Sequence, residues 1–171
     1  SRAGRLMRVY LPATFPALRA LLDTGEVGDP PLPGYAVTGA LREWYAEGDL
    51  EELEYAALSL AAKASVRLLD ADPDAVRRRV VVVAEVPDDA VQLAPHVDRA
   101  AVKVATAVPL RDVQAVHVDD TAAIPDVTVA ADAVVEADLG SEDAAFRMEQ
   151  AEGHELGWYA TQEIGPLLEL G

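Results

Sequence analysis

The chain has 171 residues, 51% of them hydrophobic, and carries 30 Asp and Glu against 14 Lys and Arg, for a formal net charge of −16. Such a charge repels phosphate backbones and anionic lipid headgroups, so the sequence argues against nucleic-acid and membrane partners. The chain contains no cysteine, which excludes disulfides, thiol catalysis and thiolate metal sites.

The length and apolar content suit one domain with a single core. No apolar stretch reaches the roughly 20 residues of a membrane span, and no signal-peptide pattern precedes Arg8. We therefore expect an acidic, cytoplasmic protein. Residues 1–6 show no periodicity and precede Met7, so we interpret them as a cloning remnant or disordered extension, with the domain over residues 7–170.

The first part of the chain predicts a strand, a helix and a second strand. Residues 8–12 have strand character, and Thr14 is placed to cap a helix with an apolar face. A loop with three prolines follows over residues 25–34, and residues 35–38 form the next short strand. This strand–helix–strand order indicates a parallel βαβ start.

The middle of the chain predicts helices followed by a buried strand. Thr38 is placed to cap a helix that runs through Tyr45, and Asp49 with Glu52 resembles a capping box that opens a helix to about Leu69. The basic run 77–79 is interpreted as solvating the entry to a strand. Residues 80–84 are entirely apolar, as in a central strand that is buried on both faces.

The last part of the chain predicts a hairpin and two helices. Residues 102–106 and 113–118 are strand-like, and the short link between them favours an antiparallel hairpin. Helices are predicted over residues 125–137 and 142–164, the second capped by Ser141. The fold class is thus α+β (mixed α/β), with an about five-stranded mixed sheet and about five helices.

The first candidate site lies at the end of the predicted strand 113–118. Strand alternation would point His117 and Asp119 to the same side of the sheet. Such a pair could bind a divalent metal or run acid–base chemistry, because imidazole titrates near neutrality and a carboxylate can orient it. Alternatively, an aspartate here caps the following segment and the histidine bonds a backbone carbonyl.

The second candidate is the segment 152–163, where polar and aromatic residues are concentrated. On a helix, His154 lies one turn before Trp158, and Glu155 lies one turn before Tyr159. Two glycines inside a helix cost about 1 kcal/mol each relative to alanine, so close packing or an interface is the competing explanation.

Several catalytic signatures are missing from the chain. The position four residues after His154 is Trp158, so the zinc-protease pattern His-Glu-x-x-His does not fit. No Gly-x-Ser-x-Gly elbow and no glycine-rich phosphate loop with its lysine are present. We accordingly expect no cofactor and no resident metal.

Four motifs together suggest a relative: residues 8–14, residues 41–45 with 51–56, residues 116–120, and residues 152–164. They resemble an actinobacterial family of uncharacterised proteins, a domain of unknown function, over residues 7–168. The preference for Ala, Val, Asp and Arg over Lys fits a high-GC genome. The resemblance implies a cytoplasmic actinobacterial protein and brings no activity with it.

Two function hypotheses follow. The favoured one is a non-enzymatic interaction or regulatory domain, with a protein partner or a second copy of the chain as the expected occupant, because aromatic residues dominate interface energetics. The alternative is a small metal- or ligand-binding enzyme, which requires the end of the hairpin to meet the last helix. The candidate interface residues are Trp44, Tyr45, Trp158 and Tyr159, and the candidate catalytic residues are His117, Asp119, His154 and Glu155, with Glu43 or Tyr55 as further members.

Overall fold

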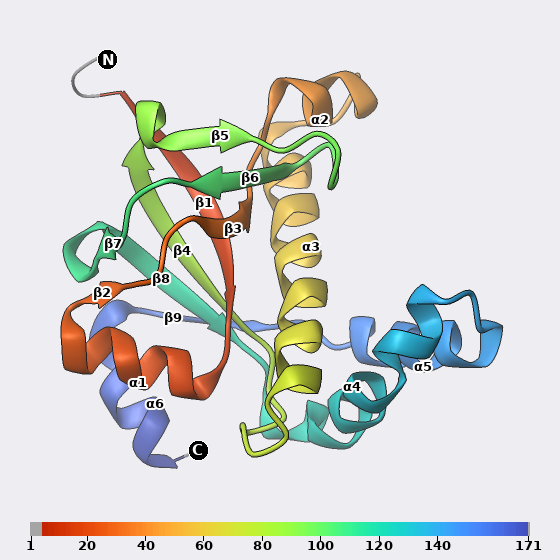
Figure 1. The fold of residues 1–171 in the computed structure, drawn as a ribbon. Helices are drawn as coiled ribbons and strands as arrows, with labels where there is room; N and C mark the ends of the chain where they lie inside the picture. The colour runs from red at the N-terminus through yellow and green to blue at the C-terminus, as the bar shows by residue number, and fades with distance from the viewer. Residues whose placement is uncertain (1–4, 171) are drawn as a thin grey trace.

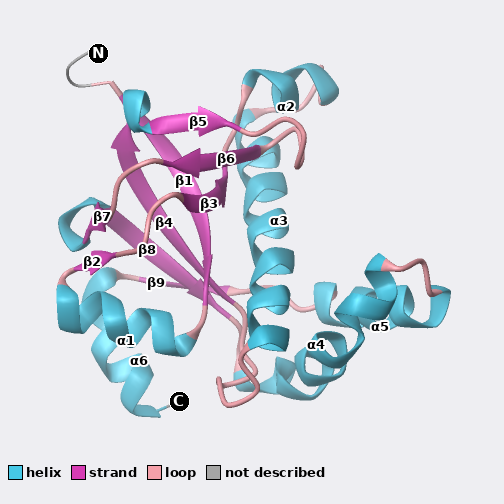
Figure 2. Ribbon diagram, viewed as in Figure 1, coloured by secondary structure: helices cyan, strands magenta, loops and turns pink. Residues whose placement is uncertain are grey.

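The structure, a computed structural model, describes residues 5–170 and has a seven-stranded sheet with helices on both faces (Figures 1 and 2). The strand order is β5-β6-β3-β1-β4-β8-β9, and every neighbouring pair is antiparallel. Two further short strands, β2 and β7, pair with each other. The strands are β1 (Leu6–Ala13), β2 (Glu26–Val27), β3 (Leu32–Tyr35), β4 (Val80–Pro87), β5 (Val91–Leu93), β6 (Ala101–Val104), β7 (Val108–Pro109), β8 (Val113–Val118) and β9 (Gly157–Tyr159).

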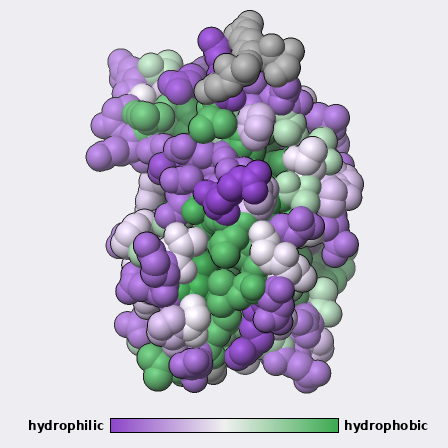
Figure 3. Space-filling model, turned by 90° about the vertical axis from the view of Figure 1, so that its left-hand side faces the viewer, coloured by the Kyte–Doolittle hydropathy of each residue, from purple (hydrophilic) through white to green (hydrophobic). Residues whose placement is uncertain are grey.

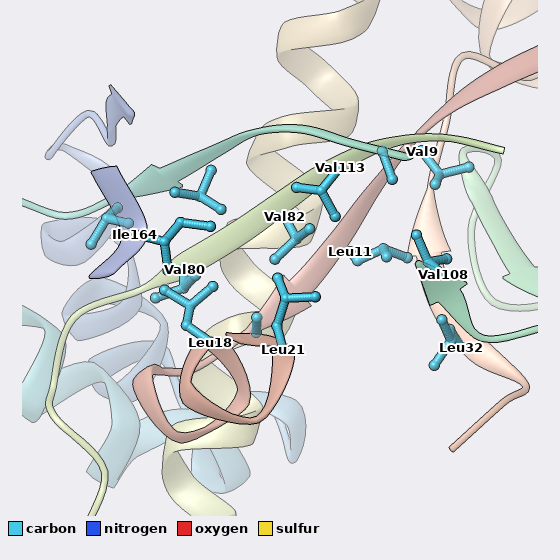
Figure 4. Close-up of a cluster of buried hydrophobic side chains, with 14 of the residues drawn as sticks. Val9, Leu11, Leu18, Leu21, Leu32, Val80, Val82, Val108, Val113 and Ile164 are labelled. Atoms are coloured by element: carbon cyan, nitrogen blue, oxygen red, sulfur yellow. The ribbon is translucent and has the colours of Figure 1, made fainter. Parts of the chain in front are cut away.

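Alternation along the central strands divides the core between the two sheet faces. Val9 and Leu11 of β1 point toward α1 and α6, whereas Tyr10 points toward α3. Figure 4 shows the first of these clusters, in which side chains of β1 and β4 meet Leu18 of α1 and Ile164 of α6. The helices are α1 (Phe15–Thr24), α2 (Gly39–Trp44), α3 (Leu50–Ala71), α4 (Ile124–Asp138), α5 (Glu142–Glu152) and α6 (Ile164–Leu170).

Helix α3 begins as its sequence predicts. The side chain of Asp49 accepts a hydrogen bond from the backbone N–H of Glu52, which satisfies one of the free donors of the first turn. Further along the helix, the fully buried Ser65 hydroxyl donates to the carbonyl of Ala13 and accepts from the N–H of Val80. This one side chain therefore joins α3 to the ends of two central strands.

Helix α4 packs against the C-terminal part of α3, and α5 packs against α4. Val66 and Leu69 of α3 contact a small apolar cluster that contains Val127 of α4 and Met148 of α5. On the opposite side of the molecule, where β2, β7 and α1 lie, hydrophobic residues gather in a central band of the surface (Figure 3). Partly buried residues such as Val27 pack there against the main core.

The predicted parallel start is wrong, because β3 runs antiparallel to β1 with Tyr35 opposite Tyr10. Ten residues of α1 rise only about 15 Å, whereas the eight residues of β1 span about 26 Å. The helix is too short to return the chain to the start of β1. The next strand of the sheet therefore begins near the end of β1 and runs back along it.

The predicted hairpin is also wrong. Strand β6 lies between β5 and β3, and β8 lies between β4 and β9, on the other side of the sheet centre. The link between them contains β7, which pairs with β2 and carries the chain away. The sheet consequently has seven strands instead of about five, and six α-helices are described instead of about five.

The predicted helix over residues 142–164 ends at Glu152. Residues 157–159 instead form the edge strand β9, which pairs with β8. Gly153 and Gly157 lower the helix propensity of this segment, and the open edge of β8 supplies hydrogen-bond partners. At the N-terminus, Leu6 already belongs to β1, while residues 1–4 of the predicted extension lie outside the described residues.

Candidate functional site

Two adjoining hollows lie between α3 and the strands beside it. The larger has a volume of about 560 Å³ and is lined by Lys63 of α3 and by the loop after α5; we call it the lysine hollow. The other, of about 490 Å³, is lined by Trp158 of β9, and we call it the tryptophan hollow. Tyr55, Leu58 and His117 line both, so the two hollows form one feature, the α3 groove.

His117 is placed at this junction by strand β8 and by an irregularity within it. The register of β8 against β4 shifts beside Val83, where Gln114 is the extra residue of a bulge. A bulge turns the following side chains to a new face, so His117 points toward α3 while Val113 points to the opposite core. Trp158 is the cross-strand neighbour of His117 and shares its face.

The imidazole of His117 has an unusual hydrogen-bonding state. Its Nδ1 atom is buried and has no hydrogen-bond partner among the described residues. Burial, with a further contribution from the positive charge of Arg8, lowers the pKa of His117 below its usual value. The ring is therefore neutral at pH 7, with one nitrogen as donor and the other as acceptor.

Asp119 does not enter the α3 groove. It is fully buried, and its two carboxylate oxygens accept hydrogen bonds at 2.8 Å from Nε and Nη2 of Arg79. Oδ2 also accepts the backbone N–H of Arg79 at 2.8 Å. The predicted pairing of His117 with Asp119 is thus absent, because the geometry of Asp119 is that of a structural ion pair.

His154 and Glu155 line the lysine hollow together with His117. The ring of His154 lies 2.8 Å from a carboxylate oxygen of Asp126, measured from Nε2 to Oδ2. Its backbone carbonyl accepts a hydrogen bond from Arg79. The loop is therefore attached at two points, and the side chain of Glu155 is exposed beside the hollow.

The four predicted interface residues are divided among three places. Trp158 lies in the tryptophan hollow, and Tyr159, on the other face of β9, packs against the main core. Trp44 and Tyr45 line a third hollow of about 920 Å³ beside α2, where the Arg99 guanidinium stacks 3.7 Å from the ring centre of Trp44.

Tyr55 lines all three hollows. Of the accessory candidates, Tyr55 is thus at the centre of this surface, whereas Glu43 lines none of the three.

The sequence reasoning missed Lys63 and Arg79. Lys63 is one of two lysines in the chain and stands four residues after Ser59, which itself follows Tyr55 by four, so the three share one helix face. That spacing was a usable signal. The interpretation of residues 77–79 as a solvated run is wrong, because Arg78 and Arg79 are buried and hydrogen-bonded to Asp119.

No group of three metal-binding side chains occurs within residues 5–170. None of the helices in the same range is long and apolar enough to cross a bilayer. The fold and the groove together define a mixed α/β protein with an antiparallel sheet and, beside its longest helix, a cleft lined by both charged and apolar side chains.

The chain belongs to the family of unknown function DUF6912, whose model matches residues 7–168. The resemblance to such a family is thereby confirmed, and its actinobacterial origin stays a prediction. Comparison with curated proteins and with solved structures gave no match. Function has therefore to be inferred from the groove itself.

Proposed function

We propose that this protein is a non-enzymatic binding and regulatory domain, and that the α3 groove is its ligand site. The observation that carries the proposal is the buried, unpartnered Nδ1 of His117 where two hollows meet. Nearly all buried polar atoms in folded proteins have a hydrogen-bond partner. The exceptions mark functional sites or places where a ligand or water binds.

The arrangement around His117 favours binding over catalysis. General acid–base work at a histidine commonly relies on a carboxylate that orients the ring and stabilises its charged form. The nearest candidate in sequence, Asp119, is committed to Arg79, and the charge that acts on His117 is the positive one of Arg8. A neutral imidazole in this setting recognises a ligand more readily than it shuttles protons.

A protein partner or a second copy of the chain is the further part of this proposal. Trp44 and Trp158 are 61% and 62% exposed, which is unusual for large aromatic side chains and typical of binding anchors. Analytical ultracentrifugation of the wild type and of Trp158→Ala would test self-association. A monomer at all concentrations would remove the second copy as partner.

The ligand site is testable with a fragment library and thermal unfolding. Binding to the folded state raises the melting temperature, so we expect hits that stabilise the wild type. His117→Phe should abolish these shifts, whereas the matched control His96→Phe should keep them, because His96 is exposed and lines none of the hollows. Hits that survive His117→Phe, or a screen without hits, would contradict the proposal.

One observation favours a second candidate, a small enzyme. His117, His154 and Glu155 line the same hollow together with Glu152, which gives it two imidazoles and two carboxylates. Each fragment that binds would be recovered after incubation with the protein and examined by mass spectrometry. Unchanged fragments support a binding domain, while conversion that is lost in His154→Gln would favour the enzyme.

A further inference from the structure

The groove carries charges of both signs, although the net charge of the chain is −16. Three cationic side chains line the two hollows, Arg8, Lys63 and Arg79, together with four carboxylates, Glu51 and Glu54 in the tryptophan hollow and Glu152 and Glu155 in the lysine hollow. Arg79 forms an ion pair with Asp119, and Nη2 of Arg8 lies 3.4 Å from Oε1 of Glu85. Lys63, in contrast, has no ion-pair partner within 4 Å in the described part of the chain. The pKa of Asp138 is lowered by its hydrogen bond from Arg67 and further by the positive charge of Lys63, but the Lys63 ammonium forms no direct ion pair with the described residues that line the lysine hollow.

The tautomer of His117 decides what its ring offers to a ligand. A proton on Nδ1 would bury an N–H without an acceptor, and folded proteins leave buried N–H groups unpaired more rarely than buried acceptors. The proton therefore resides on Nε2. Because Nδ1 has no exposed surface, the ring edge that faces the hollows is the one that carries Nε2, and it presents a hydrogen-bond donor.

The four carboxylates of the groove are divided between its hollows. Glu51 and the half-buried Glu54 line the tryptophan hollow. Glu152 and Glu155 of the lysine hollow are exposed, and neither forms an ion pair with Lys63. Burial lowers the pKa of His117, and the positive charge of Arg8 lowers it further. An ammonium without an ion-pair partner among residues 5–170, that of Lys63, and the ring of His117 line one hollow, and this combination favours an anion as its ligand.

The remaining walls are apolar or aromatic. Tyr55 is 56% exposed and follows the same helix face as Lys63, two turns earlier. Leu58 and Leu156 add aliphatic surface to the lysine hollow. A flat apolar body fits beside these side chains, since aromatic surfaces favour stacked or edge-on contacts.

We propose that the lysine hollow binds a small organic anion, a carboxylate or phosphate carried on a planar apolar group. Lys63 pairs with its charge, the Nε2–H of His117 donates a hydrogen bond to one oxygen, and Tyr55 contacts its body. This ligand class rests on the proposed function of the α3 groove, because it names what the site takes. Charge-assisted hydrogen bonds of this kind are about twice as strong as neutral ones.

The test is an NMR titration of the full chain with four probes of one shape: benzoate, phenyl phosphate, benzamide and benzylamine. We expect benzoate or phenyl phosphate to shift the side-chain resonances of Lys63 and His117, and to bind at least about tenfold more tightly than benzamide or benzylamine. Which anion binds more tightly separates the carboxylate from the phosphate. Lys63→Met should weaken the anion about tenfold, and the matched control Lys103→Met, in strand β6, should not.

The outcomes separate this inference from the proposed function. If benzamide binds as tightly as benzoate, or benzylamine binds more tightly, the ligand class is wrong while the groove remains a ligand site. Unchanged anion affinity in Lys63→Met would overturn the role of the lysine in the same way. If neither Lys63 nor His117 shifts with any probe, the ligand class is wrong, and the fragment screen with His117→Phe decides separately whether the groove is a ligand site.

Discussion

Replacing Asp119 by alanine should unfold the protein far more readily than its single lost carboxylate suggests. The substitution removes the acceptor of three hydrogen bonds, all donated by Arg79. It leaves a guanidinium whose side chain is only 3% exposed without its counter-charge, because water cannot take the place of the carboxylate there. Asp119→Ala therefore buries an unpaired positive charge.

The magnitude follows from a comparison of two ion pairs with nearly the same geometry. Breaking a buried pair costs about 3–5 kcal/mol, so Asp119→Ala should lower the melting temperature by roughly 6–20 °C. The exposed pair of Arg67 with Asp138 has the same two-bond arrangement at 3.3 and 2.8 Å. Because exposed pairs contribute about 0–1 kcal/mol, Asp138→Ala should change the melting temperature by at most a few degrees.

Urea unfolding at pH 7, followed by circular dichroism, measures both variants on the same scale. A second variant, Arg79→Met with Asp119→Leu, removes both charges and should be more stable than Asp119→Ala alone. Equal losses in Asp119→Ala and Asp138→Ala would refute the reasoning, as burial would then not govern the cost. A double variant less stable than Asp119→Ala would refute the unpaired charge as its cause.

Three further predictions concern packing, hydrogen bonding and pH. Gly34→Ala would place a Cβ 2.9 Å from the Leu11 side chain and should cost about 1–3 kcal/mol, whereas Gly39→Ala meets nothing within 4 Å and should be neutral or slightly stabilising in the same urea titration. Ser65→Ala should lower the free energy of unfolding by about 1–3 kcal/mol, because it leaves the buried N–H of Val80 in β4 without an acceptor. The hydrogen-exchange rate of the Val80 amide should rise, and an unchanged rate would contradict the hydrogen bond to Ser65. The lowered pKa of His117 means that the unfolded chain takes up this proton first as the pH falls through about 6.5. Stability should therefore decrease from pH 7.5 to 5.5 by more in the wild type than in His117→Leu, and an equal or smaller decrease would show that the pKa is not lowered.

Local signals in the sequence identify most of the individual elements. The cap at Asp49, the apolar run that begins at Val80 and the proline at position 125 each lie within one residue or so of an observed element boundary. The pairing of the strands could not be predicted in this way, because it depends on contacts between strands that are far apart in the sequence. The antiparallel pairing of β1 with β3 follows from α1 being shorter than β1, and local propensities do not contain a comparison of these two lengths.

The candidate site illustrates the same division. His117 and the pair His154 and Glu155 are distinguishable in the sequence, since the chain has only three histidines and polar and aromatic residues are concentrated in the segment around His154. Their joint presence in one hollow depends on the pairing of β9 with β8. A single helix over residues 142–164, as the sequence predicts, excludes this pairing, whereas α5 ends at Glu152. The role of Asp119 depends on its burial beside Arg79, and alternation along a strand gives only the side on which a residue emerges.

The order of strands in the sheet has a consequence for how the chain is made. Of the strands in this sheet, β1 is synthesised first. It lies in the middle of the sheet, and β3 and β4 pair with its two edges. β6 then adds outside β3, β8 outside β4, and β9 closes the far edge last. Since chains begin folding while synthesis proceeds from the N-terminus, each new strand except β5 finds its template already synthesised. The sheet can be assembled outward from its centre in nearly the order in which the message is read.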